Sequence, residues 1–379
     1  MPSTALISDL HLGSRSRADV LRRAPVRARL LEATADADRL VLLGDVVELR
    51  DLPFGVALEA ARPFFEEVGE AFAGREVVYV PGNHDHRMLG QWLEQAVATR
   101  NGDREIGLDT LVEAPHPGLH SIGTWLGDAR FEVRYPGVWV RDDVYATHGH
   151  YLDSHVTLPT IERLSVAAVD RLGGVPTGRR TEPIDYEEVH APVYDLAFSL
   201  AQGGRSLTGG KGDGRPPVMR IWEMIGGASG QARTIQGRVL GSAVIPAILR
   251  GMERGGLGSF GRDFSAAEIG RAGVAAMHVV VERLGIDAEH VIFGHIHRRG
   301  SMLADRGRGA GDPAWKRGGV TLHNTGNWMY VEGLLGLAAP QSPFWPGSMV
   351  IVPDEGAPEL VELLTDVDRE VLAGRAGRG

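Results

Sequence analysis

Short apolar runs alternate with polar loops and longer amphipathic segments at the start of the chain. Residues 4–8, 40–43 and 77–80 are mainly apolar, and each run leads directly into a polar loop. Runs of this length are typical of buried strands, whereas residues 20–33 and 56–73 space their apolar positions as surface helices do. Three repeats of strand, polar loop and helix predict βαβ units and a largely parallel sheet.

Beyond residue 130 the pattern of apolar residues predicts further strands and several longer helices. Residues 131–135 and 138–140 predict two strands that could form a hairpin across Pro136 and Gly137. Further strands are predicted at 144–147, 291–293, 320–323, 348–352 and 360–364. Helices are predicted at 158–172, 191–200, 235–252 and 266–284.

These elements predict a core that is interrupted by a long insertion. We assign residues 1–154 and 286–366 to an α/β core and residues 155–285 to a mainly helical insertion. The insertion contains a glycine-rich loop at 203–214 that we expect to be flexible. Residues 367–379 are expected to be a frayed tail.

The composition narrows the class of protein. The 379 residues are 43% hydrophobic and 23% charged, with a net charge of −9, which argues against a general nucleic-acid-binding protein. The chain has no cysteine, so disulfides, thiolate nucleophiles and cysteine-ligated zinc are excluded. The N-terminal stretch lacks the pattern of a signal peptide, and no apolar run is long enough to cross a bilayer. We therefore predict a soluble, cytoplasmic protein.

Side chains that commonly bind metals follow five of the predicted strands. They are Asp9, His11, Asp45, Asn83, His84, His148, His295 and His297. If these strands share one sheet edge, their loops converge in a single cleft. Oxygen and nitrogen ligands with one bridging carboxylate suit two divalent cations of the Mn, Fe or Zn type. Two such cations clamp a phosphoryl group and produce a hydroxide nucleophile near neutral pH, which fits the lack of a recognisable covalent nucleophile.

The motifs occur in an order that resembles a known family. The order is Asp9-Leu-His11, Gly44-Asp45, Gly82-Asn83-His84-Asp85, His148 and Gly294-His295-Ile-His297. Over residues 4–150 and 290–328 the chain resembles the calcineurin-like metallophosphoesterases. The resemblance implies an α/β fold, a four-layer α/β/β/α sandwich with two central mixed sheets.

The resemblance also implies a role for each motif residue. Asp9, His11 and His297 would hold the first metal. Asn83, His148 and His295 would hold the second, and Asp45 would bridge the two, with manganese favoured. The imidazole of His84 would face the phosphate as an electrophile or general acid, and Asp85 would be its orienting partner.

The segment after residue 44 distinguishes between branches of this family. Protein serine/threonine phosphatases continue Gly-Asp-x-Val-Asp-Arg-Gly, whereas this chain reads Gly44-Asp-Val-Val-Glu48, so a phosphoprotein phosphatase is excluded. Gly-Asp-x-x-Glu is similar to the UDP-diacylglucosamine pyrophosphate hydrolases. Those enzymes carry arginine where this chain has His84, so the similarity is a distant hint.

The sequence allows two interpretations for several polar residues near the motifs. His86 and His150 are accessory residues that could touch substrate, and Asn324 either lines the cleft or only stabilises a turn. Glu48 either hydrogen bonds a metal ligand or is an ordinary acid at a helix N-terminus.

The insertion has a distinctive charge. Residues 203–262 contain nine lysines and arginines against three acids, and an apolar stripe consists of Leu240, Val244, Ile248 and Met252. One hypothesis is a basic cap over the cleft, with peripheral membrane contact through residues 235–252. The other is a helical subdomain in which the stripe is simply core.

The combined prediction is a dimetal-dependent hydrolase of phosphodiester or diphosphate bonds, in which a metal-bound hydroxide attacks phosphorus and His84 assists. A phosphorylated small molecule, nucleotide-like or lipid-linked, is the expected substrate, and nucleic acid is not expected. The alternatives are a nuclease of the same fold and a non-catalytic interaction module. A non-catalytic module would be expected to have lost metal-ligand residues, and every motif residue of the family pattern is present in this chain. The oligomeric state stays open.

Overall fold

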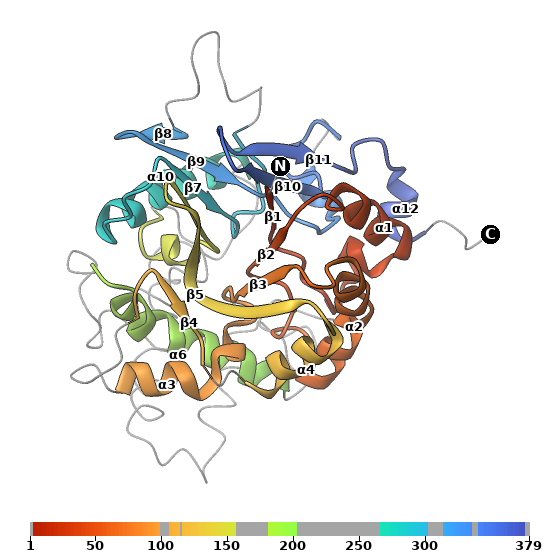
Figure 1. Cartoon of the computed structure of the whole chain (residues 1–379), viewed down its shortest axis with the longest axis horizontal. Coiled ribbons are helices and arrows are strands. Elements are labelled where there is room, and N and C mark those ends of the chain that lie inside the picture. Colours follow the sequence, from red (N-terminus) through yellow and green to blue (C-terminus); the bar gives the residue numbers. More distant parts are fainter. Residues whose placement is uncertain are drawn as a thin grey trace, which may run out of the picture.

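The computed structural model describes residues 3–98, 106–113, 116–156, 181–202, 266–301, 314–335 and 340–375. Within these residues the fold is mixed α/β, with one large sheet that curls and is flanked by helices (Figure 1). The strands follow the order β11-β10-β1-β2-β3-β5-β6-β7-β9-β8, and β4 pairs with β5 outside this path.

The first half of the sheet is built as the sequence predicts. Strands β1 (Ser3–Ile7), β2 (Arg39–Leu43) and β3 (Glu76–Val80) pair in parallel. Helices α1 (Ala24–Ala33) and α2 (Phe54–Ala71) connect them. Parallel neighbours bring their carboxyl ends to the same sheet edge, and the loops after all three strands therefore emerge there.

Strand β5 (Arg130–Arg141) is a single long strand, so the expected hairpin across Pro136 and Gly137 is wrong. Its first part pairs in parallel with β3, and its second part pairs antiparallel with β6 (Val144–Thr147). Pro136 and Gly137 lie where β5 changes partner, and extended backbone tolerates a proline at such a point.

The sheet as a whole is mixed. Strands β6, β7 (His290–Phe293) and β9 (Val320–Asn324) pair in parallel. At the other edge, β10 (Ser348–Pro353) pairs antiparallel with both β1 and β11 (Glu359–Glu362). Because β5 joins the two halves, the two separate sheets expected from the resemblance form one hydrogen-bonded sheet in the described residues. The four-layer description stays a prediction.

Side chains alternate between the two faces of each strand, so apolar residues are buried on both faces of the sheet. Leu6, Val41 and Val78 belong to the same buried cluster as Ala146 and Ile292, from the other half of the sheet. The curled sheet therefore encloses apolar side chains between its halves. The neighbouring strand residues point to the outer face, where the helices cover them.

The described ends of the predicted insertion pack on the core. Helix α10 (Ala266–Arg283) buries Val274 and Met277 in a cluster with Val291 and Phe293 of β7. Helix α6 (Pro183–Gln202) contacts the segments that follow β3 and β6. Both helices therefore contribute to the packing around the sheet. The predicted helices at 158–172 and 235–252, the glycine-rich loop and the apolar stripe lie outside the described residues.

The C-terminal segment is ordered further than predicted. Helix α12 (Arg369–Ala373) forms within the expected tail, because the Asp368 side chain caps the backbone N–H of Glu370 and Leu372 is fully buried. The frayed-tail prediction is thus wrong for residues 367–375. The remaining short elements are η1 (Val20–Arg22), η2 (His86–Leu89), α3 (Gly90–Ala98), β4 (Asp109–Leu111), α4 (Pro117–Trp125), η3 (His150–Ser154), β8 (Lys316–Arg317) and α11 (Glu332–Leu335).

Among the helices of the described residues, none combines the length and the apolar character that a membrane crossing needs.

Candidate metal centre

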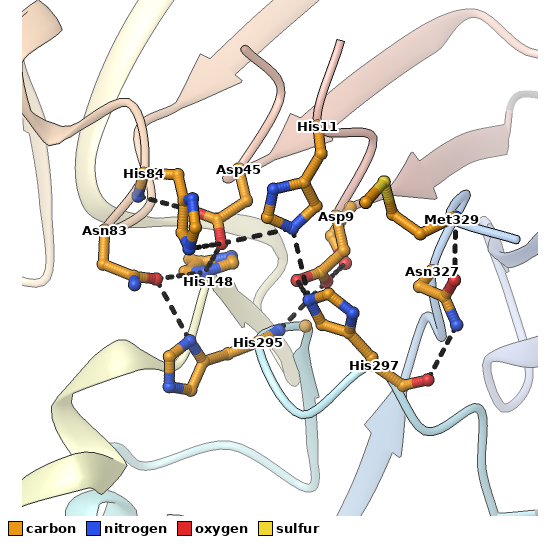
Figure 2. A network of polar contacts seen from close by, with 12 residues as sticks. Asp9, His11, Asp45, Asn83, His84, His148, His295, His297, Asn327 and Met329 are labelled. Atoms are coloured by element: carbon orange, nitrogen blue, oxygen red, sulfur yellow. Dashed lines mark hydrogen bonds and ion pairs between the residues drawn. The ribbon is translucent and has the colours of Figure 1, made fainter. Parts of the chain in front are cut away.

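The predicted ligands converge at the carboxyl edge of the curled sheet (Figure 2). They come from loops that follow five parallel-paired strands, β1, β2, β3, β6 and β7. The residues brought together are Asp9, His11, Asp45, Asn83, His84, His148, His295 and His297.

The ligand loops hold an unusual backbone conformation. Six non-glycine residues of the described structure have positive φ, and Arg17 is the one outside the site. The other five are Asp9, His11, Asp45, His295 and His297. A left-handed conformation costs about 1–3 kcal/mol per residue, so surrounding contacts must impose it. Backbone hydrogen bonds from Asp9 to Gly44 (3.0 Å) and from His11 to Asp45 (2.8 Å) lock two of the loops together.

The first ligand cluster contains Asp9, His11, Asp45 and His297, whose ligand atoms all lie within 4.8 Å of one another. The Nε2 atoms of His11 and His297 are 3.2 Å apart. Oδ1 of Asp9 lies 3.1 Å from Nε2 of His297, yet it is buried and accepts no hydrogen bond within the described structure. A buried carboxylate oxygen without a donor is the expected condition of a cation ligand.

The second cluster shares a residue with the first. It contains Asp45, His148 and His295 within the same distance limit. The Asn83 amide oxygen lies 3.1 Å from Nε2 of His148 and 3.1 Å from Nδ1 of His295 (Figure 2). Oδ2 of Asp45 lies 3.4 Å from Nε2 of His148 and 3.7 Å from Nε2 of His11. Asp45 therefore lies between the two clusters.

Contacts behind the imidazoles determine which ring nitrogen faces each cluster. Nδ1 of His11 lies 2.9 Å from Glu48, and Nδ1 of His148 donates to the carbonyl of Leu43 at 3.0 Å. A ring nitrogen that donates outward leaves the lone pair of the other nitrogen for a cation. Nε2 of both rings is therefore directed to the centre.

His295 is oriented by a residue that the sequence reasoning missed. Its Nε2 lies 3.0 Å from Oδ1 of Asp153, so its Nδ1 faces the Asn83 oxygen. Asp153 is five residues beyond His148 in η3, and it is buried. An acid five residues after a motif histidine was the available sequence signal.

The donor set fits divalent cations. Around the second cluster, an amide oxygen, a carboxylate oxygen and two imidazole nitrogens converge, and every one of these atoms can be an electron-pair donor. Such atoms repel one another unless a proton or a cation lies between them. Imidazole, carboxylate and amide ligands are those that Zn, Fe and Mn accept.

In the metal-free centre, the closely packed imidazoles and carboxylates shift one another's pKa values. Burial opposes protonation of His11, but the hydrogen bond to Glu48 and the charge of Asp45 raise the pKa of His11 to about 9. Burial likewise opposes protonation of His148, and Asp45 raises its pKa to about 9. Burial favours the neutral form of Asp45, but His148 and His84 hold the pKa of this carboxyl well below its usual value. Protonation of these imidazoles therefore competes with cation binding.

The imidazole of His84 lies at the mouth of the centre. Its side chain is 23% exposed, Nδ1 lies 2.7 Å from Oε2 of Glu48, and Nε2 lies 4.0 Å from Oδ2 of Asp45. The backbone N–H of His84 also donates to Asp45 at 2.7 Å. A bound ligand could therefore reach the ring, as the resemblance implies.

Asp85 does not contact the imidazole it was expected to orient. Its buried carboxylate accepts hydrogen bonds from the backbone N–H groups of Val46 and Gly82 and from the hydroxyl of Tyr79. Burial and the charge of Asp45 raise the pKa of Asp85. This residue holds the loops after β2 and β3 together, and Glu48 is the partner of His84 instead.

The two residues expected to touch substrate are buried. His150 is 1% exposed, and Nε2 lies 3.1 Å from the hydroxyl of Tyr135; burial lowers the pKa of His150 to about 4. Asn324 is fully buried and bonds to the backbone of Gly294 and Gly326, which is the turn-stabilising alternative. Neither side chain lines the open side of the centre.

A second buried network connects helix α6 to the motif loops. Oε2 of Glu187 lies 2.8 Å from Nε2 of His86, and its Oε1 accepts from the hydroxyls of Tyr135 and Tyr151, the latter at 2.6 Å. Although burial favours a neutral acid, His86 holds the pKa of Glu187 well below its usual value. Glu187 lies more than 100 residues beyond His86, and the sequence offered no signal for this pairing.

Comparison with known proteins agrees with this site. The family model of the calcineurin-like phosphoesterases matches residues 2–227, which is more than half of the chain. The chain therefore belongs to the calcineurin-like phosphoesterase family. This membership and the His/Asp clusters support a metal-dependent phosphoester hydrolase. No curated protein matches the chain, and the hint of a UDP-diacylglucosamine hydrolase is not confirmed.

The matched range and the structure complement each other. The match contains the loops after β1, β2, β3 and β6, whereas His295 and His297 follow β7 outside it. The tertiary structure adds these two histidines to the same centre.

Proposed function

We propose that the protein is a dimetal-dependent hydrolase that cleaves a phosphodiester or diphosphate bond. The observation that carries the proposal is the position of Asp45, which belongs to both ligand clusters. A carboxylate shared by two clusters is the arrangement that two neighbouring cations require.

Each cation has a defined set of candidate ligands. Asp9, His11 and His297 would hold the first, and Asn83, His148 and His295 the second, with Asp45 between them. When bound, two divalent cations would polarise the phosphoryl oxygens and lower the pKa of a water molecule. Mn, Fe and Zn all suit this ligand set, and manganese is our first choice.

His84 is proposed to hold the proton that the leaving oxygen needs. Its Nδ1 is fixed by Glu48 at 2.7 Å, which directs Nε2 towards the centre. A partly exposed imidazole in this position can contact the phosphoryl group of a bound substrate and donate to its leaving oxygen. Glu48 also holds His11, so one carboxylate positions both a ligand and the proposed acid.

The substrate class is proposed from the site and from the branch of the family. The segment after Gly44 lacks the arginine motif of protein phosphatases, which argues against a phosphoprotein substrate. A small phosphorylated molecule, nucleotide-like or lipid-linked, is our proposed substrate, and the nuclease stays the alternative. A cytoplasmic location and a peripheral membrane contact through residues 235–252 remain predictions, and the latter segment lies outside the described residues.

The first experiment compares bis-(p-nitrophenyl) phosphate with p-nitrophenyl phosphate in the presence of Mn²⁺. Wild type should cleave the diester, and Asp45→Asn should lose that activity together with at least one metal per chain. Asp366→Asn provides a matched loss of a carboxylate away from this centre, in the exposed pair with Arg29. Two metals per chain with no cleavage of either compound would indicate that the insertion restricts the centre to a specific substrate, and a metal content near zero after Mn²⁺ loading would point to a non-catalytic module. Preference for the monoester would indicate a phosphatase.

A further inference from the structure

The two carboxylate oxygens of Asp9 have different surroundings. Oδ1 lies 3.1 Å from Nε2 of His297 and accepts no hydrogen bond within the described structure. Oδ2 accepts from the hydroxyl of Ser8 and, at 3.0 Å, from the backbone N–H of His295. A carboxylate with two donors on one oxygen cannot turn without breaking both charge-assisted hydrogen bonds. Asp9 therefore presents one defined oxygen, Oδ1, to the first ligand cluster.

The hydroxyl of Ser8 is held by a residue from the other half of the sheet. Oγ of Ser8 lies 2.5 Å from Oγ1 of Thr325, which directly follows β9. A carboxylate that binds a cation carries no proton, so the single hydroxyl proton of Ser8 is donated to Oδ2 of Asp9. The proton between the two hydroxyls then comes from Thr325. The other acceptor within its reach, the carbonyl of Phe293, is 3.5 Å away.

Thr325 occupies a fixed position behind the centre. Both Thr325 and Ser8 are fully buried. The backbone N–H of Thr325 donates to the carbonyl of Phe293 at 3.0 Å, and its own carbonyl accepts from the hydroxyl of Ser348 at 2.6 Å. The two ligand clusters that share Asp45 contain no residue of β9 or of the loop after it. This loop nevertheless reaches Asp9 through Ser8.

The glycine at the end of β7 allows these contacts to form. A Cβ on Gly294 would overlap Oγ of Ser8 and Oδ2 of Asp9. A residue without a side chain therefore lets the end of β7 approach Asp9 closely enough for the backbone N–H of His295 to reach Oδ2. The two donors to Oδ2 thus depend on the same close approach of β1 and β7.

We propose that Ser8 and Thr325 are positioning residues for the first cation. Their hydroxyls form a relay from Thr325 to Ser8 to Oδ2 of Asp9, which fixes the carboxylate so that Oδ1 is the oxygen offered to the metal. This inference rests on the proposed function. Hydrogen bonds in series polarise one another, so the Thr325 hydroxyl strengthens the bond from Ser8 to Asp9. Because both residues are fully buried, they act through Asp9.

Ordinary core packing would give the same hydroxyls a different consequence. Buried hydroxyl groups need hydrogen-bond partners in any protein, and the loss of one lowers the stability of the fold. Such a loss would not distinguish between the two cations. The positioning role instead predicts a change at one cation only, since Oδ1 of Asp9 belongs to the first ligand set. The affinity of each metal site is therefore the property to measure.

The test titrates Mn²⁺ into the metal-free full-length protein by calorimetry. Ser8→Ala should bind one of its two Mn²⁺ ions about 10- to 100-fold more weakly than wild type. Its affinity for the other ion should stay within about twofold. Thr325→Val should weaken the same ion by about 3- to 10-fold, because it removes one neutral hydrogen bond. Thr325→Ser keeps the hydroxyl and should restore the wild-type affinity.

Thr34→Val is the matched control. It removes a buried hydroxyl that donates to the carbonyl of Leu30 at 3.0 Å, in the connection before β2 at the opposite edge of the sheet. This variant should bind both Mn²⁺ ions within about twofold of wild type. Thermal unfolding of the metal-free Ser8→Ala and Thr34→Val proteins measures what the loss of a buried hydroxyl does to the fold alone.

Three outcomes would overturn the inference. They are Ser8→Ala affinities within about twofold of wild type for both ions, equal weakening of both ions, and failure of Thr325→Ser to recover the affinity lost in Thr325→Val. The proposed function is judged separately, by diester cleavage in the metal-loaded wild type. A wild type that binds two Mn²⁺ ions but cleaves no phosphoester would remove the hydrolase proposal and leave the Ser8–Thr325 relay intact.

Discussion

Oε2 of Glu48 lies 2.7 Å from Nδ1 of His84. The same oxygen lies 2.9 Å from Nδ1 of His11. One carboxylate therefore orients two imidazoles, and although burial opposes ionisation, His84 and His11 lower the pKa of Glu48 far enough to keep it charged. Its position in the loop after β2 makes Glu48 the contact through which a metal ligand and the proposed acid are coupled.

Glu48→Gln should weaken both functions of this carboxylate. Glutamine keeps one acceptor oxygen but loses the negative charge that strengthens both hydrogen bonds, and its amide NH₂ would meet the backbone N–H of Arg50, which donates to Oε1 of Glu48. His11 should therefore be held less firmly in its ring orientation. We expect Mn²⁺ affinity to fall about 10- to 100-fold and diester cleavage to fall with it. Metal titration and steady-state kinetics measure the two effects. Glu67→Gln, which changes a partly exposed partner of Arg27, should leave both near wild type.

His84→Ala should separate chemistry from metal binding. The imidazole lies at the mouth of the centre and belongs to neither of the two clusters that share Asp45. We expect kcat for the diester to fall about 10²- to 10⁴-fold while two metals per chain are retained. Metal analysis and kinetics on the same sample provide the comparison. Unchanged kcat would remove His84 from the proton-transfer role.

Metal affinity should depend steeply on pH. The metal-free imidazoles of His11 and His148 have pKa values of about 9, so both are protonated near neutral pH and must release protons to bind a cation. Affinity should therefore rise as pH rises, by about tenfold per pH unit for each proton displaced, and level off above pH 9. Mn²⁺ titrations from about pH 6.5 to about pH 8.5, in buffers of different ionisation enthalpy, count the protons. A pH-independent affinity would contradict this view of the centre.

Glu187→Ala should destabilise the fold more than a surface change on the same segment. The substitution leaves His86, Tyr135 and Tyr151 without their shared acceptor in a buried position. We expect the free energy of unfolding to fall by about 3–5 kcal/mol. Glu182→Ala, at an exposed position just before α6, should change it by less than about 0.5 kcal/mol. Denaturant unfolding of the metal-free proteins distinguishes the two; equal effects would show that the network adds no stability.

The strands and the ligand loops were predictable because their signals are local. An apolar run of four or five residues followed by Asp, Asn or His defines both a buried strand and the chemistry at its end, as in β3 with Asn83 and β7 with His295. The parallel pairing of consecutive βαβ units then brings the loops to one edge. The local pattern failed at Pro136 and Gly137, where it predicted a turn. Pairing with strands distant in sequence keeps β5 extended through these two residues.

The sequence by itself determined the family, the strand-end positions of the ligands and the absence of cysteine chemistry. Only the tertiary structure decided which carboxylates serve the imidazoles. Asp85 is adjacent to His84 in sequence yet accepts from Val46 of the loop after β2, whereas Glu48 reaches the ring from 36 residues away. Glu187 likewise finds His86 and Tyr151 through the packing of α6. Such pairings depend on distances between segments that are far apart in the chain, and a local pattern of residues carries no information about those distances.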